Sequence, residues 1–277
     1  MNDGVYVSAS SLRLLQDCPR AWSYRYLKGH AAEDVGLGLV LGKACHAALA
    51  LFYERLRDGL PAATLDEMVA VAVASIDEAG RSSTPIARDD DDETDLAAEA
   101  ERMLRAFILS HPFQPKRVLG VELPFFLDAG QVARHPITGE QFAFEEGISG
   151  VLDLVIEDEN GIAVIDHKIC KTRPALSGGI DLQLAIYALA AEELFRSDKP
   201  VRLFHHLLVR TKTPRIELRE VPRSPHDVAE ALEAVASGVE LIHVAVGHPR
   251  PGRLLGRHRS WRCSGCGYRR RCAGDRT

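Results

Sequence analysis

Two carboxylates and an ammonium group are spaced along one stretch of the sequence so that they could share a metal-dependent site. Asp153 interrupts an apolar run from Val151 to Ile156, and Asp166 and Lys168 close a second run that begins at Ile162. A strand that only filled a core would carry Val or Ile at these positions, because an unpaired charge is costly to bury. Two carboxylates suit a hard divalent cation, and a lysine beside them could steady an anionic transition state.

The two apolar runs predict a β-hairpin, because the residues between them have turn composition. Asp166 and Lys168 are two residues apart and therefore point to the same side of their strand. A two-residue turn at Asn160-Gly161 places Lys168 opposite Asp153. A four-residue loop from Asp158 to Gly161 places Asp166 there instead. Both registers bring the three side chains to one face. A solvated Asp–Lys pair across the strands is the simpler alternative, and the apolar surroundings argue against it.

The composition is that of a soluble globular protein. The chain has 277 residues, 46% of them hydrophobic, with a net charge of −5 and a mean hydropathy of −0.09. We expect a cytoplasmic protein without a membrane partner, because the sequence shows no signal peptide and no apolar run long enough to span a bilayer. Acid is concentrated in Asp89 to Asp95, whereas the C-terminal tail is rich in arginine. This asymmetry favours a basic surface for a polyanion.

The N-terminal region predicts two short helices. Ser8 or Ser10 can cap a first amphipathic helix, and Cys18-Pro19 ends it and opens a second. We interpret the aromatic residues of the second helix as core packing, and not as a base-stacking platform. These residues are Trp22, Tyr24 and Tyr26.

A helix expected from about Lys43 to Leu56 carries a histidine that could join the carboxylates. Its glycine-punctuated entry, Gly36 to Gly42, lacks the ending of a P-loop. A lone histidine on a helix is usually structural, and His46 becomes a further metal ligand only if it lies beside the hairpin acids. Helices are also expected over residues 61–111, split by a polar loop from Arg81 to Asp95.

Strands and one further helix complete the expected elements. A strand from Val118 to Leu127 contains Glu122, and a buried carboxylate needs a partner or a metal. Residues 131–144 suggest a hairpin. Asp181 can cap a helix on which Gln183 and Tyr187 share a face. Strands are expected over residues 201–210 and 215–221, and a helix over 225–246.

Three cysteines near the C-terminus have the spacing of metal ligands. Cys263 and Cys266 are separated by two residues, and Cys272 follows. Structural zinc and iron–sulfur sites usually have four ligands. The fourth would come from one of the remaining thiols: Cys18, Cys45 or Cys170. Cys18 is the strongest candidate because it lies at a helix break, and its use would join the two ends of the chain. Disulfides are the alternative, disfavoured by the absence of export signals.

In combination, the motifs resemble the PD-(D/E)XK nuclease superfamily, and within it the RecB-like and Cas4-like iron–sulfur branch. The likeness runs over nearly the whole chain, in the order Cys18-Pro19-Arg20, Gly42-x-x-x-His46, Gly150-x-x-Asp153, Asp166-x-Lys168, Gln183-x-x-x-Tyr187 and Cys263-x2-Cys266-x5-Cys272. The second acid is Asp166 where glutamate is commonest, and His167 stands where the branch often has an aromatic residue. No helicase motif is present.

The resemblance implies an α/β fold with a restriction-endonuclease-like core, a mixed β-sheet flanked by helices, and terminal segments joined by four cysteines. It implies that Mg²⁺ or Mn²⁺ is held by His46, Asp153, Asp166 and the backbone carbonyl of His167. Lys168 would orient or activate the water, and Gln183 and Tyr187 would hold DNA or the lysine. A [4Fe–4S] cluster would lie on Cys18, Cys263, Cys266 and Cys272, with zinc as the less favoured occupant.

We therefore expect a single nuclease domain over residues 1–277. Residues 1–30 and 250–277 would form the cluster subregion, 43–111 a helical region and 117–221 the catalytic sheet. The expected function is metal-dependent hydrolysis of DNA, as an exonuclease on single strands or ends, in recombination, repair, phage or CRISPR processing. Four arginines are expected to follow the DNA backbone: Arg257, Arg259, Arg269 and Arg270. The alternative is a non-catalytic iron–sulfur scaffold that binds DNA or a helicase or CRISPR integrase. A homo-oligomer is also left open.

Overall fold

The computed structural model describes residues 7–82, 84–86, 95–110, 115–127, 137–139, 147–173, 181–196 and 201–275. Its centre is a five-stranded sheet in the order β3-β4-β5-β6-β7. Neighbouring strands are antiparallel except for β5 and β6, which are parallel. This confirms the expected mixed sheet. The strands are β3 (Arg117–Leu127), β4 (Ile148–Asp158), β5 (Gly161–Cys170), β6 (Arg202–Val209) and β7 (Arg215–Glu220).

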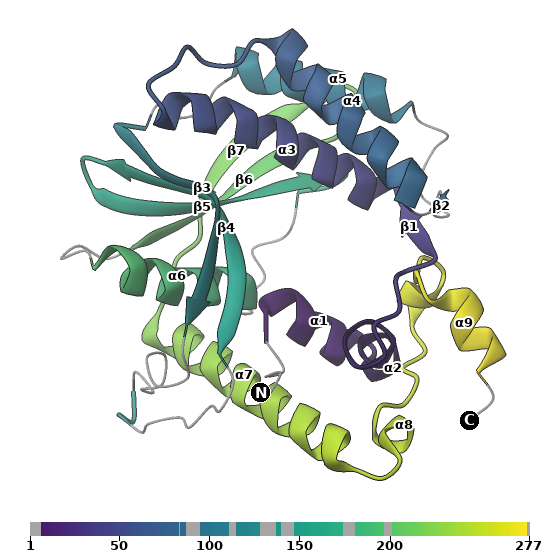
Figure 1. The fold of residues 1–277 in the computed structure, drawn as a ribbon. Helices are drawn as coiled ribbons and strands as arrows, with labels where there is room; N and C mark the ends of the chain where they lie inside the picture. Colours follow the sequence, from purple (N-terminus) through teal and green to yellow (C-terminus); the bar gives the residue numbers. More distant parts are fainter. Residues whose placement is uncertain are drawn as a thin grey trace.

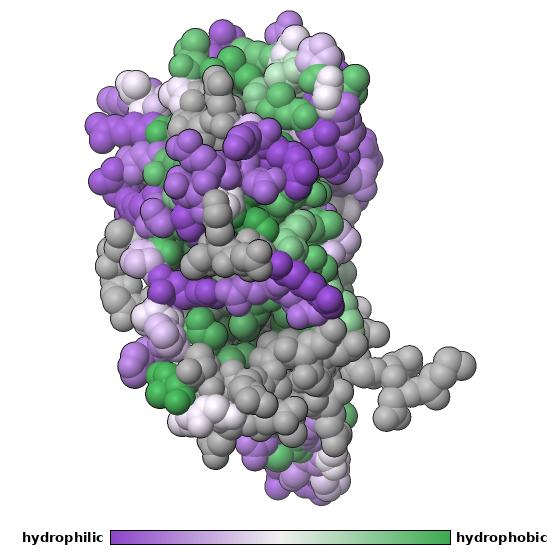
Figure 2. Space-filling model, turned by 90° about the vertical axis from the view of Figure 1, so that its left-hand side faces the viewer, coloured by the Kyte–Doolittle hydropathy of each residue, from purple (hydrophilic) through white to green (hydrophobic). Residues whose placement is uncertain are grey.

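Helices cover both faces of the sheet (Figure 1). The upper layer in that view contains α3 (Leu37–Arg57), α4 (Leu65–Ser82) and α5 (Leu96–Leu109), and the lower layer contains α6 (Leu182–Phe195), α7 (Pro225–Gly247) and α1 (Ala9–Asp17). Each layer encloses its own hydrophobic cluster against the sheet. Seen from the left-hand side of Figure 1, hydrophilic residues cover much of the upper half of the molecule (Figure 2).

The hairpin of β4 and β5 settles the register that the sequence left open. Asp158 pairs with Gly161, so Glu159 and Asn160 form the turn. Gly161 has φ of 114°, in the region that favours glycine. Leu154 pairs with Ile165, which is the register of the second expected alternative, although the turn has two residues and not four.

Two expected boundaries are wrong. The third helix begins at Leu37, not near Lys43, so Gly38 and Gly42 lie inside α3 and do not form an entry loop. The polar loop expected from Arg81 is interrupted by β2 (Thr84–Ile86), which pairs in parallel with β1 (Asp34–Gly36). The hairpin expected over residues 131–144 lies outside the described residues, apart from 137–139.

Helix α3 alone among the described helices is long and apolar enough to cross a membrane by length and composition, with a hydropathy of 1.3 over its best window. The expectation that no such run exists is therefore wrong on this criterion. A buried stripe of α3, which includes Leu41, Ala44, Ala48 and Leu49, belongs to the upper hydrophobic cluster. The core helix of a soluble domain meets the same test.

The two ends of the chain pack together at the right of Figure 1, where α2 (Pro19–Trp22) and the π-helix η1 (Ser23–Leu27) meet α8 (Pro251–Leu254), η2 (Trp261–Cys263) and α9 (Arg269–Gly274). Arg20 is 5% exposed and donates to the Leu255 carbonyl at 3.0 Å and to Asp275 Oδ2 at 3.0 Å. The Tyr24 hydroxyl donates to the same carboxylate at 2.7 Å. Burial and the bond to Asp275 raise the pKa of Tyr24 to about 12. These contacts join the termini in the described part of the chain, where no assembled cysteine cluster is seen.

The N-terminal helices agree with expectation in most details. Ser8 caps α1, its side chain accepting from the Ser11 amide at 3.1 Å. Trp22 and Tyr24 are each 1% exposed, as expected for core residues. Tyr26 is 38% exposed, so its assignment to the core is wrong. Its ring lies 5.9 Å from that of Trp22, centroid to centroid, so Tyr26 packs on the core tryptophan from the exposed side.

Candidate active site

The regular alternation of β4 breaks at Asp153. Leu152 belongs to the hydrophobic cluster below the sheet, and Leu154 belongs to the cluster above it. Residues two apart on a regular strand share a face, so β4 is distorted between them. Asp153 nevertheless lines the same cleft as Asp166 and Lys168, through this irregularity and not through simple alternation along β4. Its carboxylate also lies 3.5 Å from His46 of the upper layer.

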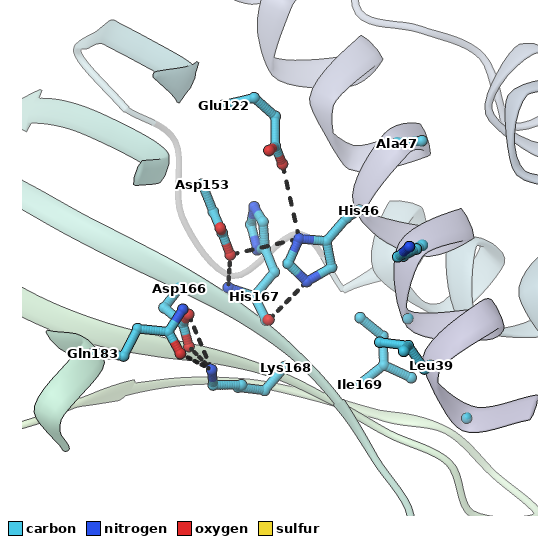
Figure 3. A pocket seen from close by; sticks show the side chains of 13 residues that line it. Leu39, His46, Ala47, Glu122, Asp153, Asp166, His167, Lys168, Ile169 and Gln183 are labelled. Atoms are coloured by element: carbon cyan, nitrogen blue, oxygen red, sulfur yellow. Dashed lines mark hydrogen bonds and ion pairs between the residues drawn. The ribbon is translucent and has the colours of Figure 1, made fainter. Parts of the chain in front are cut away.

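Asp153 is the centre of the first group of polar side chains. Its Oδ2 accepts a hydrogen bond from the His167 amide at 2.9 Å and lies 3.5 Å from His46 Nδ1. The other ring nitrogen of His46 lies 2.9 Å from the His167 carbonyl oxygen. The carboxylate of Glu122 approaches from β3, with Oε1 3.8 Å from His46 Nδ1 (Figure 3). The ligand atoms of His46, Glu122 and Asp153 all lie within 4.8 Å of one another.

Glu122 reaches this group from a strained backbone. It has φ of 42°, which is uncommon for a residue other than glycine, and β3 changes its pairing register with β4 between Val118 and Gly120. Such irregularities are frequent where a strand redirects a functional side chain. The sequence singled out Glu122 as an acid within an apolar strand but did not place it among the metal ligands.

Lys168 is the centre of the second group. Its ammonium lies 2.8 Å from Asp166 Oδ2 and donates to Gln183 Oε1 at 2.9 Å. Gln183 in turn donates to the Tyr187 hydroxyl at 2.8 Å. Gln183 and Tyr187 lie one turn apart on α6, and Asp181 caps that helix by accepting from two of its first amides. The capped helix thus fixes the amide that holds the lysine.

The two groups face one cleft of about 650 Å³ between α3 and β5. Its lining residues are Gly38, Leu39, Gly42, Lys43, His46, Ala47, Glu122, Asp153, Asp166, His167, Lys168, Ile169 and Gln183. Figure 3 shows the carboxylates of Asp153 and Glu122 converging on His46, with Asp166, Lys168 and Gln183 gathered beside them. The structure therefore brings together residues that the sequence separates by more than a hundred positions. Tyr187 contacts Gln183 behind the cleft.

Burial governs the charge of the acids. Asp166 is 1% exposed, and its burial raises its pKa to about 6 although the Lys168 ammonium acts in the opposite direction. Burial also raises the pKa of Asp153, against the lowering effects of His46 and of the His167 amide. Burial alone would lower the pKa of His46. The bond to Glu122 and the charges of Asp153 and Glu122 outweigh it, and the pKa of His46 is raised. The acids are mutually repulsive, as in a site made to bind a cation.

Two histidines that sequence reasoning missed support the site from β6. His205 pairs with Asp166 across the strands, and its Nε2 lies 3.0 Å from Asp181 Oδ2. His206 lies on the opposite face, where its Nδ1 is 2.8 Å from His167 Nδ1. Burial lowers the pKa of His167 well below its usual value, which keeps this ring neutral. The consecutive histidines in an apolar strand were the available signal.

The donor set suits a hard divalent cation. Two carboxylates and an imidazole offer ligand atoms within 4.8 Å of one another, and the carboxylate of Asp166 lies buried in the same cleft. Oxygen-rich sites with one imidazole fit Mg²⁺ or Mn²⁺. The compact ligand group contains Glu122 in place of the expected Asp166. The expected carbonyl of His167 accepts from His46 in this structure.

The four cysteines expected to bind a cluster lie in the region where the chain ends meet. Cys18, Cys266 and Cys272 pack against the small hydrophobic cluster that contains Tyr24 and Tyr268. All six cysteines of the chain are free thiols. Within the described residues, no three sulfur atoms lie within 4.8 Å of one another. The cysteines are therefore neighbours without forming a compact ligand group.

The arginines expected to contact DNA fall into two classes. Arg257 donates to the Asp275 carbonyl, and Arg270 pairs with Asp34 at 2.5 Å, so both contribute to joining the chain ends. Arg259 and Arg269 are exposed and have no carboxylate partner among the residues described. Of the four, Arg270 pairs with a carboxylate and Arg257 with a backbone carbonyl, whereas no internal partner is seen for Arg259 and Arg269 in the described part of the chain.

Comparisons with known proteins bear on this arrangement. Residues 6–273 match the profile of the family described as the PD-(D/E)XK nuclease superfamily. Among solved structures, a protein from Eubacterium rectale described as "Putative exonuclease" superposes with a TM-score of 0.52 at 14% identity. The match covers 87% of this chain and 80% of that chain, and at this identity it concerns the fold alone. The search of curated proteins gives no significant match.

Proposed function

The chain belongs to the PD-(D/E)XK nuclease superfamily, and from this premise we propose that it is a divalent-metal-dependent deoxyribonuclease that hydrolyses phosphodiester bonds. The observation that carries the proposal is the convergence of Asp153, Asp166 and Lys168 with His46 and Gln183 in one cleft. A scaffold that had lost its activity would not need to retain two buried acids, which oppose folding at neutral pH.

In this proposal, Asp153, Glu122 and His46 hold the cation, and Asp166 completes its surroundings. A divalent ion bound there would polarise the scissile phosphate and lower the pKa of water. The His167 amide, which donates to Asp153 Oδ2 at 2.9 Å, fixes the rotamer of that carboxylate. The carbonyl of the same residue fixes the ring of His46. One peptide segment thus orients two of the ligands.

Lys168 is the proposed positioning and electrostatic group for the attacking water and the phosphate. Its ammonium is held by Asp166 and by Gln183, whose amide is fixed by Tyr187. A cation held in this way stabilises negative charge that develops on phosphate oxygens without having to reorganise. Tyr187 is buried, and its pKa is raised by that burial, so it acts as a neutral hydrogen-bonding group.

Exonuclease action on single strands or DNA ends is the finer part of the proposal. The structural relative described as an exonuclease supports it, at the level of the fold that the two proteins share. The α3 side of the cleft is lined by Gly38 and Gly42, where an added Cβ would meet no atom within 4 Å. A backbone can therefore approach α3 closely.

The test is digestion of end-labelled single- and double-stranded DNA with Mg²⁺, Mn²⁺ or EDTA. We expect wild-type cleavage that requires the metal and is lost in Asp153→Ala and Asp166→Ala. Asp158→Ala is the matched control, because Asp158 lies in the same hairpin but outside the cleft, and it should cleave like the wild type. Wild-type rates in Asp166→Ala would show that the site is elsewhere. Product lengths would distinguish exonuclease from endonuclease action.

We also propose a [4Fe–4S] cluster on Cys18, Cys263, Cys266 and Cys272, which would place the chain in the RecB-like and Cas4-like branch. Support comes from the gathering of these thiols where the chain ends meet, and from Cys266, whose pKa is raised by burial and by the other three thiols. A tetrahedral zinc site requires sulfurs roughly 4 Å apart, from the usual Zn–S distance, and such a group is not found among the described thiols.

The cluster is tested by iron and sulfide analysis of anaerobically purified protein, with the visible spectrum. Cys18→Ser should lose the iron, whereas Cys170→Ser, outside the proposed set, should keep it. Zinc in place of iron in the wild type would contradict the proposal, and so would equal iron in both variants.

A further inference from the structure

Trp261 is a large apolar side chain on the surface, whereas tryptophan is usually buried. It is 76% exposed, whereas Trp22, the other tryptophan of the chain, is 1% exposed and donates to Ser11 Oγ at 2.8 Å. Indole rings are usually buried because they carry a large apolar surface. An exposed indole on a fixed backbone is a feature of surfaces that contact aromatic or apolar ligands.

The backbone of Trp261 is held in place. It begins the 3-10 turn η2, in which Ser260 Oγ accepts from the Arg262 amide at 3.3 Å and Ser264 Oγ donates to the Trp261 carbonyl at 2.9 Å. The turn is attached to the end of α1 through Asp17. The Asp17 carboxylate pairs with Arg262 at 3.1 Å, and its carbonyl oxygen lies 2.9 Å from His258 Nδ1. The indole therefore projects from a preorganised site.

The chain segment that carries the indole is rich in arginine, some of it paired with Asp17, Glu33 and Asp34. Residues 248–275 contain eight arginines and one acid, Asp275, in a chain whose net charge is −5. The guanidinium of Arg262 lies 5.0 Å from the Trp261 ring centroid. Several further arginines have no carboxylate partner in the described part of the chain and are exposed: Arg253, Arg259 and Arg269. An apolar protein surface would be a poor partner for this region, and a polyanion with flat rings is a good one.

We infer that Trp261 is a stacking platform for an unpaired base of single-stranded DNA, and that Arg259 contacts the adjacent phosphate. The inference rests on the proposed function for the class of polymer, but it concerns a surface that lies outside the cleft. Stacking on an aromatic ring requires an exposed base face, which a duplex interior does not offer. Arginine supplies the salt-dependent attraction for the backbone. The platform would thus give the enzyme a preference for single strands or frayed ends.

The experiment is fluorescence anisotropy of a labelled oligothymidylate and of a labelled duplex in EDTA, which prevents cleavage. Full-length anaerobically purified protein is compared with Trp261→Ala and Trp261→Phe. We expect Trp261→Ala to weaken single-strand binding by about fivefold or more, from the usual contribution of base stacking. Trp261→Phe should recover most of the affinity, and binding of the duplex should change less than about twofold.

Two controls separate stacking from loss of structure. Iron content and the urea midpoint of Trp261→Ala should equal those of the wild type. Arg259→Gln should weaken binding of single strands and duplexes alike and should reduce the salt dependence of binding. Unchanged single-strand affinity in Trp261→Ala would overturn the inference, and so would an equal loss for the duplex.

The outcome is independent of the proposed catalytic site. If Trp261→Ala binds like the wild type while Asp166→Ala remains inactive, the stacking platform is wrong and the nuclease proposal stands. If Trp261→Ala loses single-strand affinity while Asp166→Ala still cleaves, the platform stands and the catalytic assignment fails.

Discussion

Replacing Asp166 by asparagine should stabilise the metal-free protein while it abolishes cleavage. Asp166 is 1% exposed, and burial raises its pKa to about 6 from an ordinary value of 3.8. Because the folded-state pKa is the higher one, the folded state binds the proton more tightly than the unfolded state. The contribution of this proton to the free energy of unfolding is fully present below the unfolded-state pKa. It is lost as the pH rises through the folded-state pKa.

The magnitude follows from this difference of about two pKa units. At about 1.4 kcal/mol per unit, the ionised carboxylate reduces the free energy of unfolding by about 3 kcal/mol at pH 7. Asparagine avoids this loss because it is neutral and similar in shape. Asp166→Asn should therefore gain up to about 3 kcal/mol at pH 7, and nothing near pH 3.5, where Asp166 itself is protonated. The gain is an upper value, since Lys168 loses its anionic partner.

The assay is urea unfolding followed by circular dichroism in EDTA, at pH 7 and at the lowest pH where the wild type remains folded. Asp158→Asn in the same hairpin is a control that should change the free energy of unfolding in the opposite direction. Burial raises the pKa of Asp158, but hydrogen bonds from Arg202 and the Asn160 amide outweigh it and lower the pKa. Asp158→Asn should therefore lose stability at pH 7. An Asp166→Asn protein no more stable than the wild type at pH 7, or equally stabilised at both pH values, would refute the reasoning.

Three further predictions concern other parts of the structure. Lys168→Met should lower the cleavage rate by a hundredfold or more, about the usual effect of removing one electrostatic group, and should leave the circular dichroism spectrum unchanged; a wild-type rate would exclude the proposed role. Gly150→Ala should destabilise the fold by about 1 to 3 kcal/mol, because a Cβ there would lie 2.5 Å from the Phe125 ring. Gly42→Ala, where a Cβ meets nothing within 4 Å, should gain up to about 1 kcal/mol in the same urea titration; equal effects at the two positions would contradict the packing argument. Because the pKa of Tyr24 is raised to about 12, its stabilising contribution is present below pH 10 and is lost as the pH rises through 12. Tyr24→Phe should accordingly be less stable than the wild type at pH 8 and should lose less stability between pH 10 and 12, which unfolding midpoints at these pH values would measure.

The sequence predicted the sheet better than it predicted the site. The β-branched runs and the turn between them indicate β4 and β5, because local composition decides a hairpin. The register remained open, since it depends on whether Asp158 and Gly161 pair, and that is decided by packing on both faces. The start of α3 was not predicted because Gly38 and Gly42 indicate a loop. The packing of α3 against the sheet outweighs the low helix propensity of these two glycines.

The missed site residues share one physical cause. Glu122 was singled out as an acid in an apolar strand but not assigned to the metal, and His205 and His206 were not predicted. All three act through contacts between segments that are distant in sequence, and a local pattern can mark such a residue but cannot name its partner. The position of Asp153 depends on an irregularity of β4, which a rule of strict alternation along a strand does not predict. The arginine tail shows the same limit: its composition indicated a basic surface, but Arg257 and Arg270, although exposed, are engaged by Asp275 and Asp34 and join the chain ends.

The parallel pairing of β5 with β6 determines when, during folding, the cleft becomes complete. Antiparallel β4 and β5 join through a two-residue turn, so the strands that carry Asp153 and Asp166 can meet early. Strand β6 can pair with β5 only after the chain has crossed over through α6, and closing that longer loop is entropically unfavourable and slow. Gln183 and His205 arrive with this crossover. We therefore expect nascent chains that end before α6 to hold the acids without the amide that positions Lys168, so that the protein acquires its activity only when the sheet is finished.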